Sequence, residues 1–287
     1  MYRLLAFLPL LVLAACADSG DVPDATSGEI PPEAERIVTL GGPVTETVYA
    51  LGLGDRIVGA DQSSLFPADV MGKPRLNYFR QTSAEGVLSL EPTLVIALES
   101  AGPPGVLDQI RAAGVAVETV PEVQNLADAE ARVRTLGGLL SRETQADSVI
   151  GVMQTDLASA EAARPDVAPR ALFVYARGAG TVMVGGTATS AEAVMTLAGA
   201  DNAVSAFEDF QPLTAEALVT AAPDVIVIPE RGLESLGGID GLLEQPGIAQ
   251  TPAGQNRRIV AVDDALLLGF GPRIGQGVQA LAEGLGG

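Results

Sequence analysis

Short apolar runs alternate with amphipathic stretches along most of the chain. The apolar runs have the length and the β-branched content of buried strands, and they lie at 36–40, 56–61, 93–98 and 115–120. The stretches at 46–54 and 105–114 have apolar positions at helical spacing and end at glycines. Strands that alternate with helices in this way predict an α/β fold with mostly parallel sheets.

A phrase that occurs twice in the sequence indicates two such units. The segments "TSAEGVLSLEPTLVIAL" and "LTAEALVTAAPDVIVIP" begin at Thr82 and Leu213. In each of them a glutamate, Glu85 or Glu216, precedes a proline by seven residues, and a strand-like run follows. The alternative is a common α/β sequence pattern that recurs by chance, because proline often occurs in the loop between a helix and a strand. We favour a duplicated architecture.

The segment between the two units is predicted to be one long helix. Ser141 can cap it, Pro165 can stop it, and the apolar side chains between them share one helical face: Ala146, Val149, Ile150, Met153, Leu157 and Ala160. We therefore expect two Rossmann-like α/β lobes, at 36–140 and 166–287, joined by a long α-helix at 141–165. A stiff connection of this kind allows the lobes to rock through modest angles only.

The first 15 residues have the pattern of a signal peptide. They carry one cation and no acid, and their apolar core is too short to span a bilayer. The sequence "LAAC" resembles the lipobox of bacterial lipoproteins, in which the thiol of Cys16 would be lipidated; the alternative is a secreted protein with a stray thiol. Residues 16–35 are polar and contain proline, as expected of a tether. In both cases the protein works outside the inner membrane.

The composition excludes several kinds of active site. The 287 residues contain no histidine, which rules out Ser-His-Asp and Cys-His catalysis and histidine-ligated metals. One cysteine allows no internal disulfide, so a hydrophobic core must hold the fold. The net charge of −19 argues against nucleic acid as a partner.

The segment "LNYFRQTSAEG" at 76–86 contains the most eligible metal-binding residue. In an extended stretch Tyr78 and Arg80 would share a face, and a nearby guanidinium favours the phenolate. A phenolate is a hard oxygen donor that suits ferric iron, and ferric haem in particular. The alternative, which the residue types alone favour, is a loop tyrosine packed over Pro74, with Arg80 paired to a surface acid. The other tyrosines are less eligible, because they lie in the signal peptide, on a helix and inside a strand-like run: Tyr2, Tyr49 and Tyr175.

Several longer stretches resemble the haem-binding lipoproteins that serve bacterial haem-uptake ABC transporters. They span about 36–285 and include "RIVTLGGPVTETVYALGLGDRIVGADQSSLFP", "YFRQTSAEGVLSLEPTLVIA", "AGPP", "GGIDGLL" and "LLLGFGPR". The resemblance implies a class III periplasmic binding protein that holds haem between two lobes. It places the axial iron ligand on Tyr78 and the arginine that hydrogen-bonds this ligand on Arg80. Because no histidine is available from the second lobe, we expect one five-coordinate, tyrosinate-bound ferric haem.

A haem pocket needs apolar walls and a few cations for the two carboxylates. By the internal repeat, "FEDFQPL" at 207–213 corresponds to "NYFRQTS", and Phe270 lies between two glycines that would let a flat ligand approach. The candidate walls are Phe79, Phe207, Phe210 and Phe270, and the candidate carboxylate partners are Arg177, Arg231 and, more weakly, Arg273. For each of them the alternative is a core phenylalanine or a solvated arginine.

The resemblance also implies a docking surface, with one acidic residue per lobe that meets arginines of a permease dimer. Glu85 matches by motif, and Glu192 is the nearest acid of the second lobe, about one turn from the expected place. An acid in a first helical turn is also favoured by the helix dipole alone. The expected partners are haem, the permease dimer with its cytoplasmic ATPase, and the membrane through a lipid on Cys16. We expect a periplasmic, lipid-anchored monomer that is not an enzyme.

Three other functions fit parts of the sequence. A binding protein for a ferric siderophore or a corrinoid would share the architecture, but its site usually has more polar groups and tryptophans than this Trp-free chain offers. A carboxylate-based hydrolase such as a glycosidase would use the abundant acids, yet no acid pair stands in a catalytic motif. A surface lipoprotein that only binds another protein also remains open.

Overall fold

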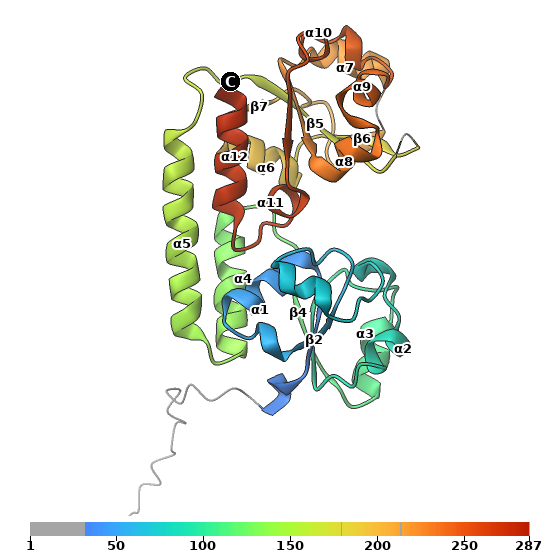
Figure 1. Ribbon diagram of the computed structural model, residues 1–287, viewed down its shortest axis with the longest axis vertical. Helices are drawn as coiled ribbons and strands as arrows, with labels where there is room; N and C mark the ends of the chain where they lie inside the picture. Colours follow the sequence, from blue (N-terminus) through green and yellow to red (C-terminus); the bar gives the residue numbers. More distant parts are fainter. Residues whose placement is uncertain (1–31, 179, 213, 287) are drawn as a thin grey trace, which may run out of the picture.

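The chain folds into two α/β lobes that lie one above the other beside a wall of long helices, as seen in a computed structural model (Figure 1). The structure describes residues 32–178, 180–212 and 214–286. The predicted signal peptide at 1–15 and Cys16 therefore lie outside the described residues. Within the described residues, no helix is both long enough and apolar enough to cross a membrane.

The N-terminal lobe is built on a four-stranded parallel sheet with the strand order β2-β1-β3-β4. Its strands are β1 (Ile37–Leu40), β2 (Ile57–Ala60), β3 (Leu94–Leu98) and β4 (Ala116–Val120). Its helices are α1 (Gly42–Ala50), α2 (Ala84–Leu88) and α3 (Val106–Ala112), with 3-10 turns η1 (Pro32–Glu35), η2 (Gly54–Arg56), η3 (Ala68–Gly72) and η4 (Phe79–Gln81). Every residue of β1 and β3 is buried, which explains their uninterrupted apolar sequences.

The C-terminal lobe has a mixed six-stranded sheet with the order β10-β9-β5-β6-β8, and β7 also pairs with β5. Its strands are β5 (Arg170–Ala176), β6 (Val182–Gly185), β7 (Asp201–Asn202), β8 (Phe210–Pro212), β9 (Val225–Pro229) and β10 (Ile259–Val262). Strands β10, β9, β5 and β7 are parallel, whereas β6 pairs antiparallel with β5 on one side and with the edge strand β8 on the other. Its helical segments are α6 (Ser190–Leu197), α7 (Ala215–Ala221), α8 (Glu230–Ser235), α9 (Gly238–Leu243), η5 (Ile248–Gln250), α10 (Pro252–Gln255) and α11 (Asp264–Leu268).

Three long helices form the wall that connects the lobes: α4 (Leu126–Leu139), α5 (Glu143–Ala162) and α12 (Ile274–Gly286). Helix α5 leads from one lobe to the other and packs on both α4 and α12 (Figure 1). A Cβ atom on Gly137 would lie 2.5 Å from the Cβ of Ala146, and one on Gly275 would lie 2.4 Å from the Cβ of Asp156, so both contacts of α5 need glycine. The N-cap residue of α5 is Arg142, and the prediction that Ser141 caps it is wrong.

The observed architecture confirms the predicted fold class of two α/β lobes joined by one long helix. The two copies of the sequence phrase also fold alike. Glu85 lies in the first turn of α2, before the buried strand β3, and Glu216 lies in the first turn of α7, before the buried strand β9. The mixed edge of the second sheet is the main feature that the sequence pattern did not indicate.

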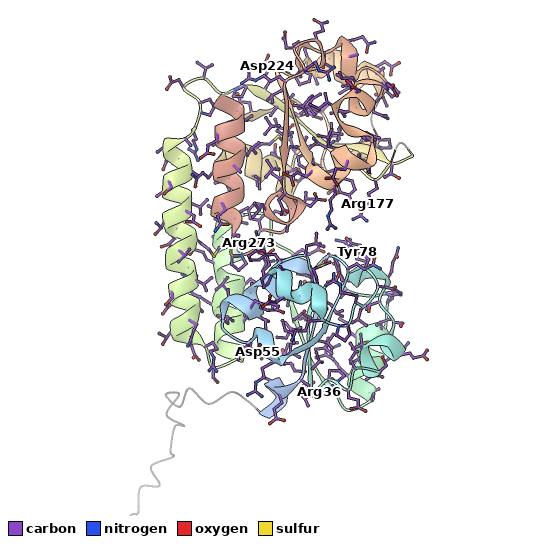
Figure 2. The ribbon with its side chains drawn as sticks, viewed as in Figure 1. Arg36, Asp55, Tyr78, Arg177, Asp224 and Arg273 are labelled. Atoms are coloured by element: carbon purple, nitrogen blue, oxygen red, sulfur yellow. The ribbon has the colours of Figure 1, made fainter. Side chains whose placement is uncertain are left out.

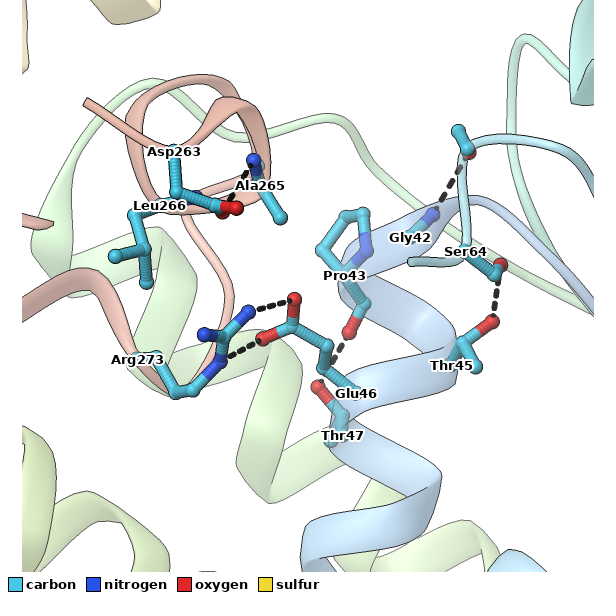
Figure 3. Close-up of polar contacts among 12 residues, drawn as sticks. Gly42, Pro43, Thr45, Glu46, Thr47, Ser64, Asp263, Ala265, Leu266 and Arg273 are labelled. Carbon is cyan, nitrogen blue, oxygen red and sulfur yellow. Dashed lines mark hydrogen bonds and ion pairs between the residues drawn. The ribbon is translucent and has the colours of Figure 1, made fainter. Parts of the chain in front are cut away.

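A bidentate ion pair ties α1 to the segment that precedes α12 (Figure 3). Glu46 accepts hydrogen bonds from Arg273 at 2.8 Å (Nη2 to Oε1) and 3.1 Å (Nε to Oε2). The Arg273 guanidinium also stacks on the ring of Phe66, with Cζ 3.5 Å from the ring centroid. The Glu46 side chain is 6% exposed and that of Arg273 is 18% exposed. The start of α12 is thus anchored to the N-terminal lobe by a largely buried ion pair.

We expect Arg273→Met to lower the free energy of unfolding by about 3–5 kcal/mol at pH 7, because it leaves the Glu46 carboxylate buried without its partner. Burial already raises the pKa of Glu46 above its ordinary value of 4.5, although the hydrogen bond and the charge of Arg273 lower it. A raised folded-state pKa means that the folded protein binds this proton more tightly than the unfolded chain. The loss should therefore be largest at neutral pH and should shrink as the pH falls through the folded-state pKa towards 4.5.

Chemical denaturation of both proteins across this pH range measures the effect. Arg257→Met is the matched control, because Arg257 pairs with Asp240 at the surface, where both side chains are more than half exposed. An exposed pair of this kind contributes about 0–1 kcal/mol. Equal losses for the two variants would contradict an important role of the Glu46–Arg273 pair.

Candidate ligand-binding site between the lobes

Tyr78 lies on the surface of the N-terminal lobe that faces the C-terminal lobe (Figure 2). It is half-buried and immediately precedes the 3-10 turn η4. The predicted extended conformation is therefore wrong from Phe79 onward, and the shared face of Tyr78 and Arg80 is lost with it. The Phe79 ring is 6% exposed and packs edge-on against the Tyr78 ring at 4.6 Å between centroids. Phe79 thus fixes the loop from within the lobe's core and leaves little surface for a ligand.

Arg80 pairs with an acid of its own lobe and not with the phenol. Its Nη2 atom lies 2.6 Å from Oε1 of Glu122, and its guanidinium lies 5.3 Å from the Phe79 ring centroid. Within the part of the chain that the structure describes, no hydrogen bond joins Arg80 to Tyr78. The alternative in which Arg80 meets a surface acid is the one observed here.

A different arginine reaches Tyr78, and it comes from the other lobe. Arg177 follows β5, and its Cζ atom lies 5.7 Å from the ring centroid of Tyr78 and 5.6 Å from that of Tyr175. Its Nε atom also donates a hydrogen bond to the phenol oxygen of Tyr175. One guanidinium therefore contacts two phenol rings, one from each lobe, and Figure 2 shows Arg177 and Tyr78 pointing toward each other.

Phe210 and Tyr175 form an aromatic surface on the C-terminal lobe. Both are half-buried, and their ring centroids are 6.3 Å apart. Phe173 lies behind Phe210, with 6.1 Å between centroids. Four residues, two of them aromatic side chains of the C-terminal lobe, define a surface that we call the interlobe junction: Tyr78, Tyr175, Arg177 and Phe210.

Sequence reasoning missed Tyr175 because it lies inside a strand-like run. In the structure it is the second-last residue of β5, at the carboxyl end of a parallel strand, where α/β folds place their ligand-binding groups. A signal was present in the sequence, since "YAR" at 175–177 repeats the Tyr-x-Arg spacing of "YFR" at 78–80.

Burial controls the ionisation of Tyr78. It raises the pKa of the phenol above its ordinary value of 10.0, and the charges of Arg80 and Arg177 oppose this shift only in part. The charge of Arg80 thus favours the phenolate, as expected, but by less than burial disfavours it. The phenol keeps its proton at neutral pH, and a metal would have to displace that proton.

A completely buried carboxylate holds the Tyr78 loop in place. Asp61, which follows β2, accepts hydrogen bonds at Oδ2 from the backbone N–H groups of Phe79 (3.0 Å) and Ser63 (2.8 Å). Its Oδ1 atom accepts from the backbone N–H of Gly41 (2.8 Å) and the hydroxyl of Ser64 (3.0 Å). Asp61 thereby joins the end of β2, the start of α1 and the loop that carries Tyr78. An acid directly after a buried strand, as in "RIVGAD", was the sequence signal for it.

Two of the other nominated residues pack mainly against the protein itself. The Phe270 ring is completely buried, so the prediction that it forms a pocket wall is wrong; its place is in the core. Arg273 pairs with Glu46 and stacks on Phe66, so it would have to leave both in order to bind a ligand carboxylate, and its role at a ligand stays a prediction. Both lie in the segment that anchors α12, which the "GFGPR" motif alone did not indicate.

Two nominated residues of the C-terminal lobe, Phe207 and Arg231, are not among the four residues of the junction. Phe207 is half-buried and packs over Gly186, where a Cβ atom would come within 2.5 Å of the Phe207 ring. Arg231 is exposed at the start of α8, and its backbone N–H donates to Oδ2 of Asp264 at 3.1 Å. Its guanidinium remains a candidate partner for an anionic ligand group.

The acids proposed for docking have different surroundings. Glu85 is exposed in the first turn of α2. Glu192 lies in an arrangement close to a capping box: the Thr189 hydroxyl accepts from the N–H of Glu192 at 3.1 Å, and Oε2 of Glu192 accepts from the N–H of Ala188, the residue before the N-cap, at 2.8 Å. Its carboxylate is thus engaged with its own helix. Glu216, exposed in the first turn of α7, is the counterpart of Glu85, as the sequence repeat already indicated.

Within the described residues, no group of three or more His, Cys, Asp and Glu side chains is placed to hold a bare metal ion. The oxygens that could bind a metal at the interlobe junction are those of single phenols. A single protein oxygen suffices for haem iron, because the porphyrin supplies the equatorial ligands.

We expect Asp61→Asn to lower the free energy of unfolding by about 1–3 kcal/mol, because an amide nitrogen would face N–H donors that lose their acceptor. The negative charge of Asp61 also helps to raise the pKa of Tyr78, so the phenol should ionise at lower pH in the variant. A tyrosinate absorbance titration, with Tyr78→Phe to identify the signal, measures this. Asp69→Asn is the control, since Asp69 is exposed in η3. Unchanged stability would contradict the role of Asp61 as an anchor.

The fold and the sequence have close matches among known proteins. Residues 37–266 match the sequence profile of a family described as periplasmic binding proteins. The periplasmic heme-binding protein RhuT from Roseiflexus sp. RS-1 is 40% identical, with 88% of this chain and 98% of that one covered and a TM-score of 0.83. The periplasmic heme-binding protein BhuT, solved in complex with two hemes, is 38% identical, with 87% and 98% covered and a TM-score of 0.80.

A curated relative extends the match over nearly the whole sequence. An uncharacterised ABC transporter substrate-binding lipoprotein of Bacillus subtilis, YvrC, is 26% identical over 97% of this chain and 94% of its own length. The family profile covers most of the chain, and the two-lobed architecture agrees with it. This protein therefore belongs to the periplasmic binding protein family.

Proposed function

We propose that this protein captures haem between its two lobes outside the cytoplasm and delivers it to an ABC-type import permease. The observation that carries the proposal is a half-buried phenol, Tyr78, at the interlobe junction of a chain whose fold is matched over most of its length by RhuT and BhuT. Both of these are haem-binding proteins, which favours capture of a ligand over hydrolysis. It also favours haem over a siderophore or a corrinoid.

The phenol oxygen of Tyr78 binds the ferric iron as its single axial protein ligand, which gives a five-coordinate haem. The phenol is protonated beforehand, so binding releases this proton. The resulting phenolate lies near the guanidinium groups of Arg80 and Arg177, whose charges stabilise it. Asp61 and Phe79 hold the loop and thereby fix where the oxygen stands.

The porphyrin reaches Tyr78 only when the Arg177 side chain leaves its position against the two phenol rings. Arg177 is exposed and lies in a turn after β5, so a change of rotamer suffices. The displaced guanidinium and that of Arg231 can then pair with the two propionates. In a protein with a net charge of −19, such cations at the site determine whether an anionic ligand is retained. Phe210 supplies an apolar wall on the C-terminal side.

Lobe motion is restricted by the helical wall. Helix α5 packs closely on α4 and α12, and the Glu46–Arg273 pair anchors α12 to the N-terminal lobe. Opening by a small rocking motion is the movement that this frame permits, and the permease would use it to release the haem.

Delivery requires a place at the membrane and a surface for the permease. We place the protein in the periplasm as a monomer, with residues 1–15 removed as a signal peptide and a lipid on Cys16, in line with the description of YvrC as a lipoprotein. Glu85 and Glu216, one on each lobe, are the acids that we assign to the arginines of the permease dimer, which works with its cytoplasmic ATPase. Glu192 is the weaker candidate, because its carboxylate caps α6.

Titration with substoichiometric hemin should give the charge-transfer absorbance of a ferric phenolate, and Tyr78→Phe should lose it. Loss of the iron ligand should weaken binding of this first equivalent by more than the roughly 10–100-fold typical of losing a supporting contact. Affinity for the wild type should rise with pH, by up to about tenfold per unit below the phenol pKa, because one proton leaves on binding.

Two further measurements complete this experiment. One is the same titration of Arg80→Lys, and the other is competition between hemin and ferric siderophores or cobalamin. The lysine keeps a charge near the phenol, so the absorbance should persist. Preferential binding of a siderophore or of cobalamin would contradict haem as the ligand. Tyr78→Phe binding hemin with unchanged affinity and spectrum would contradict Tyr78 as its ligand.

Delivery should depend on Glu85 and Glu216 together. We expect Glu85→Gln and Glu216→Gln each to reduce haem uptake by the reconstituted transporter and the double variant to abolish it, with hemin affinity unchanged. Glu192→Gln is the matched control, since glutamine can also complete a capping box. If Glu192→Gln stops uptake and Glu216→Gln does not, the assignment of the second docking acid is wrong.

A further inference from the structure

Glu122 holds the Arg80 side chain on the N-terminal lobe. It follows β4, and its Oε1 atom lies 2.6 Å from Nη2 of Arg80. The same Oε1 atom accepts a hydrogen bond of 2.5 Å from the hydroxyl of Ser100, which follows β3. Strands β3 and β4 are parallel neighbours, so both residues lie at the carboxyl edge of the sheet, where α/β folds bind their ligands.

The ion pair with Glu122 weakens the effect of Arg80 on the phenol of Tyr78. The charge of Arg80 already lowers the pKa of this phenol, although burial raises it by more. A carboxylate 2.6 Å from the guanidinium cancels much of the potential that the cation exerts farther away. In the function that we propose, the phenolate on iron needs a nearby cation to replace its lost solvation. Glu122 and the bound ligand therefore compete for one guanidinium.

Arg80 can leave Glu122 with little loss of stability. The two side chains are 50% and 43% exposed, and an ion pair so open to water contributes little to stability. After the release, Glu122 keeps its hydrogen bond from Ser100. Its charge also raises the pKa of the buried Arg132, against the lowering that burial causes, so a second cation lies within its electrostatic reach. The carboxylate is therefore not left without favourable neighbours.

We propose that Glu122 is a positioning residue that holds Arg80 in the empty protein and gives it up when haem binds. The inference rests on the proposed function. In the complex Arg80 faces the anionic oxygen on the iron, and Glu122 takes the guanidinium back when the permease draws the haem away. Glu122 thus lowers the affinity and speeds the release, as suits a protein that hands its ligand over.

Glu122→Gln should bind hemin more tightly, because it removes the competitor for Arg80. We expect the dissociation constant to fall by about two- to fivefold, as for the loss of one exposed ion pair, and hemin to leave more slowly. Glu118→Gln is the matched control, since Glu118 is exposed on β4 and its loss changes the net charge equally. In an Arg80→Ala background, Glu122→Gln should change the affinity no more than Glu118→Gln does.

An absorbance titration of the Tyr78 phenol without hemin tests the pair independently of haem. The phenol should ionise at lower pH in Glu122→Gln than in the wild type or in Glu118→Gln, with Tyr78→Phe to identify the signal. Thermal unfolding should show that all variants are folded.

Three results would overturn the role of Glu122 and leave the proposed function intact. They are an unchanged titration of the phenol, a hemin affinity of Glu122→Gln equal to that of Glu118→Gln, and an equal gain in affinity when Arg80 is alanine. A wild type that binds no hemin would overturn the proposed function itself, whereas a phenol that ionises at lower pH in Glu122→Gln would still show that Glu122 restrains the charge of Arg80.

Discussion

The desolvation of one phenol governs the behaviour of the interlobe junction. Tyr78 is half-buried between two lobes, and burial holds its proton in place although two arginines lie nearby. A neutral phenol can remain at such a site at little cost, whereas a phenolate needs a cation that compensates for the lost solvation. In the function that we propose, ferric iron is such a cation, so the proton and the metal would compete for one oxygen.

The scaffold around this oxygen serves to keep it in place. Asp61 joins three segments of the N-terminal lobe by accepting hydrogen bonds from their backbone N–H groups. The Tyr78 loop is therefore held through its backbone. On the other side of the molecule, Gly137 and Gly275 allow α5 to lie close to its neighbours, and the Glu46–Arg273 pair fastens α12 to α1. These contacts restrict the motion of the lobes, and Arg177 lies on an exposed segment between them.

Local sequence patterns were sufficient for the strands, the connecting helix and the duplicated lobes, because each depends on the spacing of apolar residues within one segment. These local patterns could not predict the partners of charged side chains. Arg80 meets Glu122, which is 42 residues away, and Arg273 meets Glu46, which is 227 residues away, so only the tertiary fold decides these pairs. Tyr175 was passed over for a related reason. Its strand-like surroundings indicate burial, but the position at the end of β5 that opens it to the junction follows from the sheet topology.

The most direct measurement is a crystal structure of the protein grown with hemin. The account requires the iron to be bonded to the phenol oxygen of Tyr78, with the porphyrin enclosed by both lobes, Arg177 moved out of its present position against the Tyr78 ring, and the packing of α5 on α4 and α12 unchanged. A haem found elsewhere on the protein, or one between the lobes whose iron has no bond to Tyr78, would contradict it.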